Sequence, residues 1–290
     1  MKHTWAWLPL AFLCGCMPPM HGEQPCSGWE AVVNFRLPPR MDFCGEPVPL
    51  EREDVREALE REFYLLLQQP GQLVLYLKRS GRYFELFEQV LRRAQMPSDL
   101  KYLAIAESAL LPTARSPKEA VGLWQIIPET ARQLGLRVDS LVDERRHPER
   151  STQAAIEYLR RGYERFGSWT LAAAGYNMGH DALQRQLQRQ GVQSFYDAFL
   201  NEETTRYIYR ILAIKHLLEN AAQFGLALAP YPALRGRRIR WEREIPDLVA
   251  WARQQGVRYR DVRVLNPWIL RDQLPAPPPG AAYEILLPPE

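Results

Sequence analysis

The sequence has no strong charge of either sign: 37 Lys and Arg residues against 34 Asp and Glu residues give a net charge of +3. The basic residues form no evident cluster, so the composition does not favour a protein that binds nucleic acid. The five histidines are scattered and none lies at ligand spacing from a cysteine, which argues against a metal site. Before residue 235 no run alternates between apolar and polar residues, so we expect no sheet domain there.

Long apolar runs are also missing, apart from "TWAWLPLAFL" at residues 4–13. This run is too short for a stable membrane anchor and follows Lys2, as in a signal peptide. It ends in "LCGC", which resembles a bacterial lipoprotein signal with Cys16 as the lipidated first residue. The alternative is an ordinary secretory signal with an incidental cysteine. Lipidation, with Met17 rather than an aspartate after Cys16, predicts the periplasmic face of the outer membrane. Secretion alone predicts the periplasm.

Two cysteines, Cys26 and Cys44, remain beyond this segment. In an oxidising compartment two such thiols usually pair. We therefore expect either a structural disulfide between them or no role for either.

The length of 290 residues, 46% of them hydrophobic, allows a full core and a second module. From Pro49 to about residue 225 apolar residues recur at helical intervals, which predicts a mainly α fold of short, capped helices. After a proline-containing linker the pattern becomes strand, helix, helix, strand. The predicted organisation is a signal at 1–15, an irregular tether at 16–48, a helical extension at 49–96, an all-α domain at 97–226 and a small βααβ module at 237–289.

Prolines and capping residues define the predicted helix ends. A helix over residues 51–68 ends before Pro70-Gly71, and a second, over residues 83–95, ends before Pro97. Ser98 and Asp99 would begin the next helix as N-cap and first-turn acid, and Pro112 would end it.

This last helix holds a single acid, Glu107, in the run "KYLAIAESALLP". At about 100° per residue, Glu107 lies near the middle of a stripe formed by Leu100, Leu103, Ala104 and Leu111. A carboxylate on a buried face costs several kcal/mol unless it is paired, hydrogen-bonded or protonated. Burial also raises a carboxyl pKa, which suits a group that donates protons near neutral pH.

Four motifs follow one another in the helical domain: "ESAL" at Glu107, "GLWQI" at residues 122–126, "GYNMG" at residues 175–179 and "ETTRYI" at residues 203–208. Their order and spacing resemble the lysozyme-like lytic transglycosylases of glycoside hydrolase family 23. The branch of membrane-bound lytic transglycosylase D is the most similar, from about residue 55 to residue 225. The resemblance implies a lysozyme-like all-α catalytic domain.

The resemblance also implies an enzyme that cleaves the β-1,4 bond between N-acetylmuramic acid and N-acetylglucosamine in peptidoglycan glycan strands. Glu107 would protonate the leaving oxygen and then accept a proton from the 6-hydroxyl of the muramic acid, so that 1,6-anhydromuramoyl products form without water. This chemistry needs no second carboxylate, and the family motifs place none beside Glu107. It implies no metal or other cofactor.

By the same resemblance, supporting roles fall to other motif residues. Ser108 would contact the substrate or orient the acid, and the Tyr207 hydroxyl would lie near Glu107 or the reacting N-acetyl group, although Tyr207 could instead be a core residue. Gln125 can offer a donor and an acceptor to a sugar N-acetyl group, and Asn177 would act similarly on a turn held by Gly179. Aromatic faces for sugars would come from Trp124, Tyr176 and Trp169, with packing the favoured reading for Trp169.

The βααβ module resembles LysM, a small peptidoglycan-binding domain, through "LVAWARQQGVRYRDVRVLNPW" at residues 248–268. The usual Gly-Asp turn after the first strand is missing, and Glu242–Asp247 stands in its place. Sugar binding and a degenerate packing role therefore both stay open. Trp268 fits either, while Trp251 is expected in the core.

Two rival functions remain. A goose-type-lysozyme-like hydrolase would use water on the same bond and would need an acid to activate it. A non-catalytic cell-wall-binding scaffold would use the helical domain as a sugar groove, but the joint presence of Glu107, Gln125, Asn177 and Tyr207 argues against it. The sequence indicates no protein partner.

Overall fold

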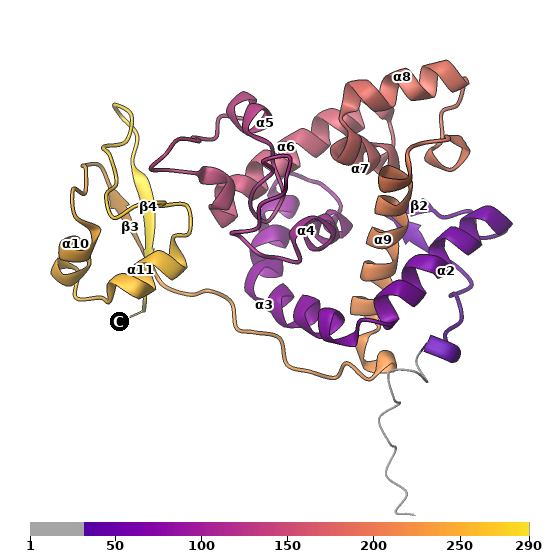
Figure 1. The fold of residues 1–290 in the computed structure, drawn as a ribbon, viewed down its shortest axis with the longest axis horizontal. Coiled ribbons are helices and arrows are strands. Elements are labelled where there is room, and N and C mark those ends of the chain that lie inside the picture. Colours follow the sequence, from indigo (N-terminus) through magenta and orange to yellow (C-terminus); the bar gives the residue numbers. More distant parts are fainter. Residues whose placement is uncertain (1–31, 290) are drawn as a thin grey trace, which may run out of the picture.

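The computed structural model describes residues 32–289 and is mainly helical, with two small antiparallel sheets (Figure 1). The predicted mainly α fold class, with its βααβ module, is confirmed. Cys16 and Cys26 lie outside the described residues, so lipidation and the disulfide to Cys44 stay predictions.

The α-helices that precede the C-terminal module form the helical part of the chain. They are α2 (Glu53–Leu67), α3 (Pro70–Arg93), α4 (Lys101–Ser108), α5 (Pro128–Gln133), α6 (Pro148–Phe166), α7 (Trp169–Met178), α8 (His180–Gln190) and α9 (Glu202–Glu219).

Helix α9 is central to this part. It contacts α2, α3, α4 and α7, and Figure 1 shows it between α2 and α7. Its residues Ile208, Ile211, Leu212 and Ile214 are at most 1% exposed and belong to one continuous hydrophobic core. A residue on α9 is therefore positioned by several helices at once.

Two predicted helix starts are corrected. The sequence predicts Pro70 as a stop signal and the second helix from residue 83, but Pro70 opens α3, because a proline at the first helical position lacks only an N–H that would have no partner in the helix. Ser98 makes no capping hydrogen bond and lies in a 3₁₀ turn, Ser98–Leu100, ahead of α4. Asp99 instead accepts hydrogen bonds from the Cys44 backbone N–H over 2.8 Å and from Lys215 Nζ over 2.7 Å, which ties the lead-in segment to α9.

The end of α4 also differs from the prediction. The helix ends at Ser108 rather than near Pro112, because Ala109 and Leu110 take left-handed backbone angles, with φ of 52° and 60°. Such angles are costly for residues with a Cβ and persist only where packing enforces them, as the burial of Leu110 does. Leu111 consequently leaves the apolar stripe and is 40% exposed.

Part of the predicted irregular tether is ordered. Residues 42–47 form a hairpin of β1 (Asp42–Phe43) and β2 (Glu46–Pro47), with Phe43 fully buried. The Glu46 carboxylate accepts bonds from the Thr170 N–H over 2.9 Å and from the Ser168 hydroxyl over 2.9 Å. A carboxylate at a helix N-terminus is favourable, so this hairpin anchors the start of α7.

The linker that follows α9 packs along α3. The Tyr231 N–H donates to the Lys78 carbonyl over 2.7 Å, and Lys78 Nζ donates to the Ala229 carbonyl over 2.8 Å. Gly81 permits this approach, because a Cβ at this position would lie 2.3 Å from the Tyr231 carbonyl oxygen. A glycine inside a helix costs about 1 kcal/mol relative to alanine, and the linker contact offsets that cost.

The C-terminal module consists of β3 (Arg237–Trp241), α10 (Leu248–Gln254), α11 (Tyr259–Leu265) and β4 (Tyr283–Leu287), with β3 and β4 paired antiparallel. Asn266 is 1% exposed and connects α11 to β4. Its amide nitrogen donates to the Val262 and Leu286 carbonyls over 2.8 and 2.7 Å, and its oxygen accepts from the Leu286 N–H over 2.9 Å. Trp251 and Trp268 are both buried in the module's core.

This module docks on the helical part through Val142. Val142 is fully buried within the module's own hydrophobic core, although it precedes α6 in the chain. Two backbone hydrogen bonds of 2.9 Å flank it, from the Asp143 N–H to the Trp268 carbonyl and from the Leu270 N–H to the Leu141 carbonyl. The two parts of the chain thus share one packed interface.

Among residues 32–289, no helix is both long and apolar enough to cross a membrane.

Val142→Ala is expected to lower the free energy of unfolding by about 2 kcal/mol, because the substitution leaves a cavity in the core of the C-terminal module. Urea denaturation followed by tryptophan fluorescence measures this. Val33→Ala is the matched control: Val33 is 49% exposed, so a change within about 0.5 kcal/mol is expected. Equal effects of the two substitutions would contradict the shared core.

Candidate active site

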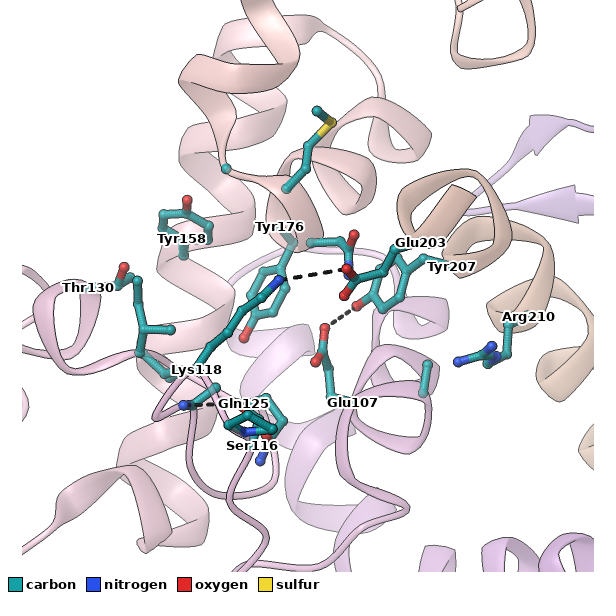
Figure 2. A pocket seen from close by; sticks show the side chains of 18 of the residues that line it. Glu107, Ser116, Lys118, Gln125, Thr130, Tyr158, Tyr176, Glu203, Tyr207 and Arg210 are labelled. Atoms are coloured by element: carbon teal, nitrogen blue, oxygen red, sulfur yellow. Dashed lines mark hydrogen bonds and ion pairs between the residues drawn. The ribbon is translucent and has the colours of Figure 1, made fainter. Parts of the chain in front are cut away.

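A cavity of about 840 Å³ lies where the four motifs converge (Figure 2). Its lining comes from the end of α4, the loop before α5, the end of α7 and the start of α9. Five of the predicted site residues line it: Glu107, Gln125, Tyr176, Asn177 and Tyr207.

Glu107 occupies the last turn of α4, and its carboxyl group points toward Tyr207 (Figure 2). The Tyr207 hydroxyl donates a hydrogen bond to Glu107 Oε1 over 2.6 Å, across 100 residues of sequence. Burial raises the pKa of Glu107 to about 7, an effect larger than the lowering by the Tyr207 hydrogen bond; the Glu203 charge raises the pKa further and Arg210 lowers it. A carboxyl group with a pKa near neutrality can both give and take a proton at physiological pH.

The turn of α9 that carries Tyr207 is fixed by Glu62 of α2. Glu62 is 2% exposed and accepts from Arg206 Nε over 2.6 Å and from Arg210 Nε over 3.3 Å. Arg206 and Arg210 lie one turn apart on either side of Tyr207, so one buried carboxylate holds both ends of that turn. Glu62 was not predicted from the sequence, although it lies on an apolar helix stripe with Leu59, as Glu107 does with Leu103.

Two further carboxylates, Glu202 and Glu203, also line the cavity, and Glu202 pairs with Arg61 at 3.0 Å. The Glu203 side chain is 69% exposed, and an oxygen lies 3.7 Å from Lys118 Nζ (Figure 2). An exposed ion pair of this kind contributes little to stability, so both groups remain free to engage a ligand. Glu203 opens the fourth motif, so the prediction that the motifs place no second carboxylate beside Glu107 is corrected: Glu203 lines the same cavity, and its charge raises the Glu107 pKa. The two residues are far apart in sequence, so local patterns gave no sign that they share one cavity.

Gln125 sits in a strained loop. Its φ is 47°, and the loop depends on Gly122, where φ is 90° and an added Cβ would lie 2.0 Å from the Arg145 carbonyl oxygen. Gln125 Nε2 donates to the Gly122 carbonyl over 2.9 Å and to the Ala114 carbonyl over 3.2 Å. The amide nitrogen is therefore occupied within the protein, and the predicted double role is corrected to that of an acceptor through Oε1.

Tyr176 and Asn177 come from the last turn of α7, before Gly179, so Asn177 belongs to the helix rather than to the predicted turn. The Tyr176 hydroxyl donates to the Trp124 carbonyl over 2.6 Å, and burial raises its pKa, so it stays neutral. Asn177 Oδ1 accepts from the Thr204 hydroxyl over 2.8 Å. This bond leaves the Asn177 amide nitrogen as the group that can donate to a ligand.

The structure corrects the predicted sugar contact of Trp124 and favours one of the two roles predicted for Ser108. Trp124 is fully buried, with Nε1 donating to Thr152 Oγ1 over 2.9 Å, so its ring cannot form a face of the cavity. Ser108 Oγ is directed at the Ala104 and Leu123 carbonyls over 3.1 and 2.9 Å. That geometry ties the end of α4 to the Gly122 loop and favours orientation of the acid over substrate contact.

Trp169 stacks on Tyr163, with ring centroids 4.1 Å apart, and does not line the cavity. This arrangement agrees with the favoured packing reading. Within residues 32–289, no group of three or more His, Cys, Asp and Glu side chains is arranged to hold a metal ion.

Two family models match parts of the chain. Residues 86–199 match the family described as the transglycosylase SLT domain, and residues 237–290 match the soluble lytic transglycosylase C-terminal LysM-like domain. The chain therefore carries both domains, and the resemblances drawn from the four motifs and from the C-terminal run are confirmed.

Individual relatives are similar over part of their length. Membrane-bound lytic murein transglycosylase D of Escherichia coli strain K12 is 34% identical over 142 residues, which is 47% of this chain and 31% of the relative. The peptidoglycan transglycosylase gp16 of Escherichia phage T7 is 35% identical over 118 residues, 40% of this chain and 9% of the relative. The crystal structure of the 70-kDa soluble lytic transglycosylase of Escherichia coli aligns with a TM-score of 0.44 at 23% identity, over 60% of this chain and 31% of that one. Each match spans less than a third of the relative.

Glu107→Gln is expected to stabilise the protein at pH 8 by about 3 kcal/mol more than at pH 4. Below the ordinary value of 4.5 the carboxyl group is protonated in both states, and between there and about 7 only the folded state keeps its proton. Stability from this group is therefore lost as the pH rises through that window, and glutamine removes the loss. Urea denaturation at the two pH values measures it.

Glu62→Gln is the matched control. It replaces a glutamate that is 2% exposed and paired with Arg206 and Arg210, so the substitution should destabilise the protein at pH 8. If Glu107→Gln changed the free energy of unfolding equally at pH 4 and pH 8, the result would contradict the raised pKa of Glu107.

Proposed function

We propose that the chain is a peptidoglycan lytic transglycosylase that cleaves the β-1,4 bond between N-acetylmuramic acid and N-acetylglucosamine. The proposal rests above all on Glu107, a carboxyl group with a pKa of about 7 that points into a large cavity and is held by the Tyr207 hydroxyl. The SLT-domain match and the names of the relatives support the same reaction class.

In the proposed reaction, protonated Glu107 transfers its proton to the glycosidic oxygen as the bond from that oxygen to the muramic acid C1 breaks. The resulting Glu107 carboxylate then accepts the proton of the 6-hydroxyl as its oxygen bonds to C1. The two steps restore the acid, consume no water and leave a 1,6-anhydromuramoyl end. Tyr207 stabilises the intermediate carboxylate, because its hydroxyl donates to Oε1.

Recognition of an N-acetyl group fits two other lining residues. Gln125 offers a carbonyl oxygen, since its nitrogen is occupied, and Asn177 offers an amide nitrogen, since its oxygen is occupied. An acetamido group has one N–H and one C=O, so the pair is complementary to it. The Tyr176 ring supplies an apolar wall to the same cavity.

The hydrolase alternative gains a specific candidate in Glu203. A carboxylate on the same cavity could activate water, as in inverting glycosidases. Glu203 is 69% exposed and lies 3.7 Å from Lys118, so it lacks the buried setting of Glu107, which leaves the role of proton donor to Glu107 in either reaction. The products distinguish the two reactions.

A cell-envelope location accompanies this activity, since peptidoglycan lies there and a relative is named as membrane-bound. We place the chain on the periplasmic face of the outer membrane, with Cys16 as the lipid attachment site. Labelling with a radioactive or clickable fatty acid, with Cys16→Ser as control, tests the anchor.

Digestion of purified sacculi tests the reaction. Wild type is expected to release muropeptides with anhydro ends, as read by mass spectrometry, and Glu107→Gln is expected to lose at least about 100-fold in rate because the proton donor is gone. Glu203→Gln should still give anhydro ends. Reducing ends from wild type, lost in Glu203→Gln, would establish the hydrolase instead, and sacculus binding without cleavage would establish a scaffold.

The Tyr207 hydroxyl should influence the pH dependence of this reaction. Tyr207→Phe removes the bond that stabilises the Glu107 carboxylate, so the pKa of Glu107 rises and the fall in rate at alkaline pH moves up by about one pH unit. Rates of sacculus solubilisation across pH 5 to 10 measure it. Tyr209→Phe, on the same helix but outside the cavity lining, serves as control, and equal shifts in both variants would contradict the assignment.

A further inference from the structure

A second cavity, of about 650 Å³, lies at the junction between the helical part and the C-terminal module. Its lining comes from α3, the loop that follows α4, the linker after α9 and helix α11. Figure 1 shows α11 on the side of the module that faces α3. We refer to this cavity as the junction cavity. We infer that it binds the carboxylate-bearing peptide stems of peptidoglycan, an inference that rests on the proposed function.

The charge of the junction cavity has one sign. Five arginines line it and no aspartate or glutamate does: Arg79, Arg82, Arg146, Arg260 and Arg263. Of these, only Arg263 forms an ion pair with a described carboxylate, that of Asp272 at 3.1 Å. Clustered guanidinium groups without partners repel one another, and a bound anion would relieve that repulsion.

Arg146 gives the most specific sign of a missing partner. Its Nε atom is buried and has no hydrogen-bond partner among the described residues. A buried donor of this kind is costly unless a ligand or water accepts from it. The neighbouring Arg145, in contrast, is fully engaged with Asp143, at 2.8 Å, and turns away from the junction cavity.

Apolar surface accompanies the charge. Of the eight large hydrophobic residues described as exposed, three line this one cavity: Leu111 at 40%, Tyr231 at 36% and Val264 at 55%. The Arg82 guanidinium lies over the Tyr231 ring, 4.7 Å from its centroid. Guanidinium groups among aliphatic and aromatic side chains suit a ligand that carries both carboxylates and alkyl groups, as a short acidic peptide does. A phosphate-rich surface would not need the apolar part.

The position of the junction cavity matches such a ligand. Thr113 lines it, and Ser116, three residues on, lines the catalytic cavity. Three residues span at most about 10 Å, so the linings of the two cavities come within that distance of each other along this loop, which is within the length of an extended tripeptide. Arg79 also donates to the Ala109 carbonyl over 3.0 Å, which holds the loop that separates the two cavities.

A free stem peptide tests the inference without catalysis. The probe is synthetic L-alanyl-γ-D-glutamyl-meso-diaminopimelic acid, titrated into the purified chain and followed by ligand-observed NMR. We expect saturable binding that weakens as salt rises. The same peptide with its carboxylates converted to carboxamides should bind at least about tenfold more weakly, because the charge-assisted hydrogen bonds are lost.

Variants locate the site. Arg82→Gln with Arg260→Gln removes two exposed guanidinium groups that form no ion pair, so folding should be retained, and peptide binding should weaken about tenfold. Arg92→Gln with Arg93→Gln, at the other end of α3, makes the same change in net charge outside the junction cavity and should change binding less than about twofold.

Three results would overturn the inference: no binding of the peptide to wild type, equal binding of the amidated peptide, or equal loss in the two double variants. A different result would assign the arginines to a lipid surface instead. In that case the wild type would bind vesicles containing anionic phospholipid but not the peptide, and only Arg82→Gln/Arg260→Gln would lose vesicle binding. None of these results depends on cleavage. Failure of the proposed reaction would appear separately, in the sacculus digest.

Discussion

The 2.6 Å hydrogen bond between Tyr207 and Glu107 places a neutral donor against a carboxyl group that burial tends to protonate. Burial and this bond act on the Glu107 pKa in opposite directions, and burial has the larger effect, so the value settles at about 7. Both partners must be held rigidly for such a balance to persist. Glu62 holds the α9 side through Arg206 and Arg210, and two left-handed residues after Ser108 end α4 at the acid.

Much of this arrangement could be predicted from local patterns. Helical periodicity and capping signals give the helices, and Glu107 stands out because one acid interrupts an apolar stripe. The same stripe argument applied to α2 would have found Glu62, next to Leu59 and Phe63 on the buried face. Prolines were less informative, because Pro70 both follows one helix and opens another.

The sequence could not show which of two chemically similar side chains faces the cavity, or which of its atoms stays free for a ligand. Gln125 and Asn177 have identical functional groups, yet internal bonds to the Gly122 carbonyl and from the Thr204 hydroxyl leave one as acceptor and the other as donor. Trp124 and Tyr176 are both aromatic motif residues, but only Tyr176 lines the cavity. The roles of Asn177 and Tyr176 depend on contacts with segments 27 and 52 residues away, which local patterns do not encode. The role of Gln125 depends on the left-handed backbone of its own loop, which places its amide nitrogen against the Gly122 and Ala114 carbonyls.

The position of the C-terminal module is also set by contacts between distant segments, through the core that it shares with Val142. Because a residue of the helical part completes the core of the C-terminal module, the module is held in one orientation rather than tethered loosely. Two of its three tryptophans, Trp251 and Trp268, are buried and so are not exposed stacking surfaces for sugars, while Trp241 at the end of β3 is half-buried. Its fixed position instead brings α11 against α3 and creates a junction cavity that neither part forms alone. For a polymer with charged side branches, a rigid second cavity beside the proposed catalytic one contributes more to alignment than a freely moving binding module would, because the module loses less orientational freedom on binding.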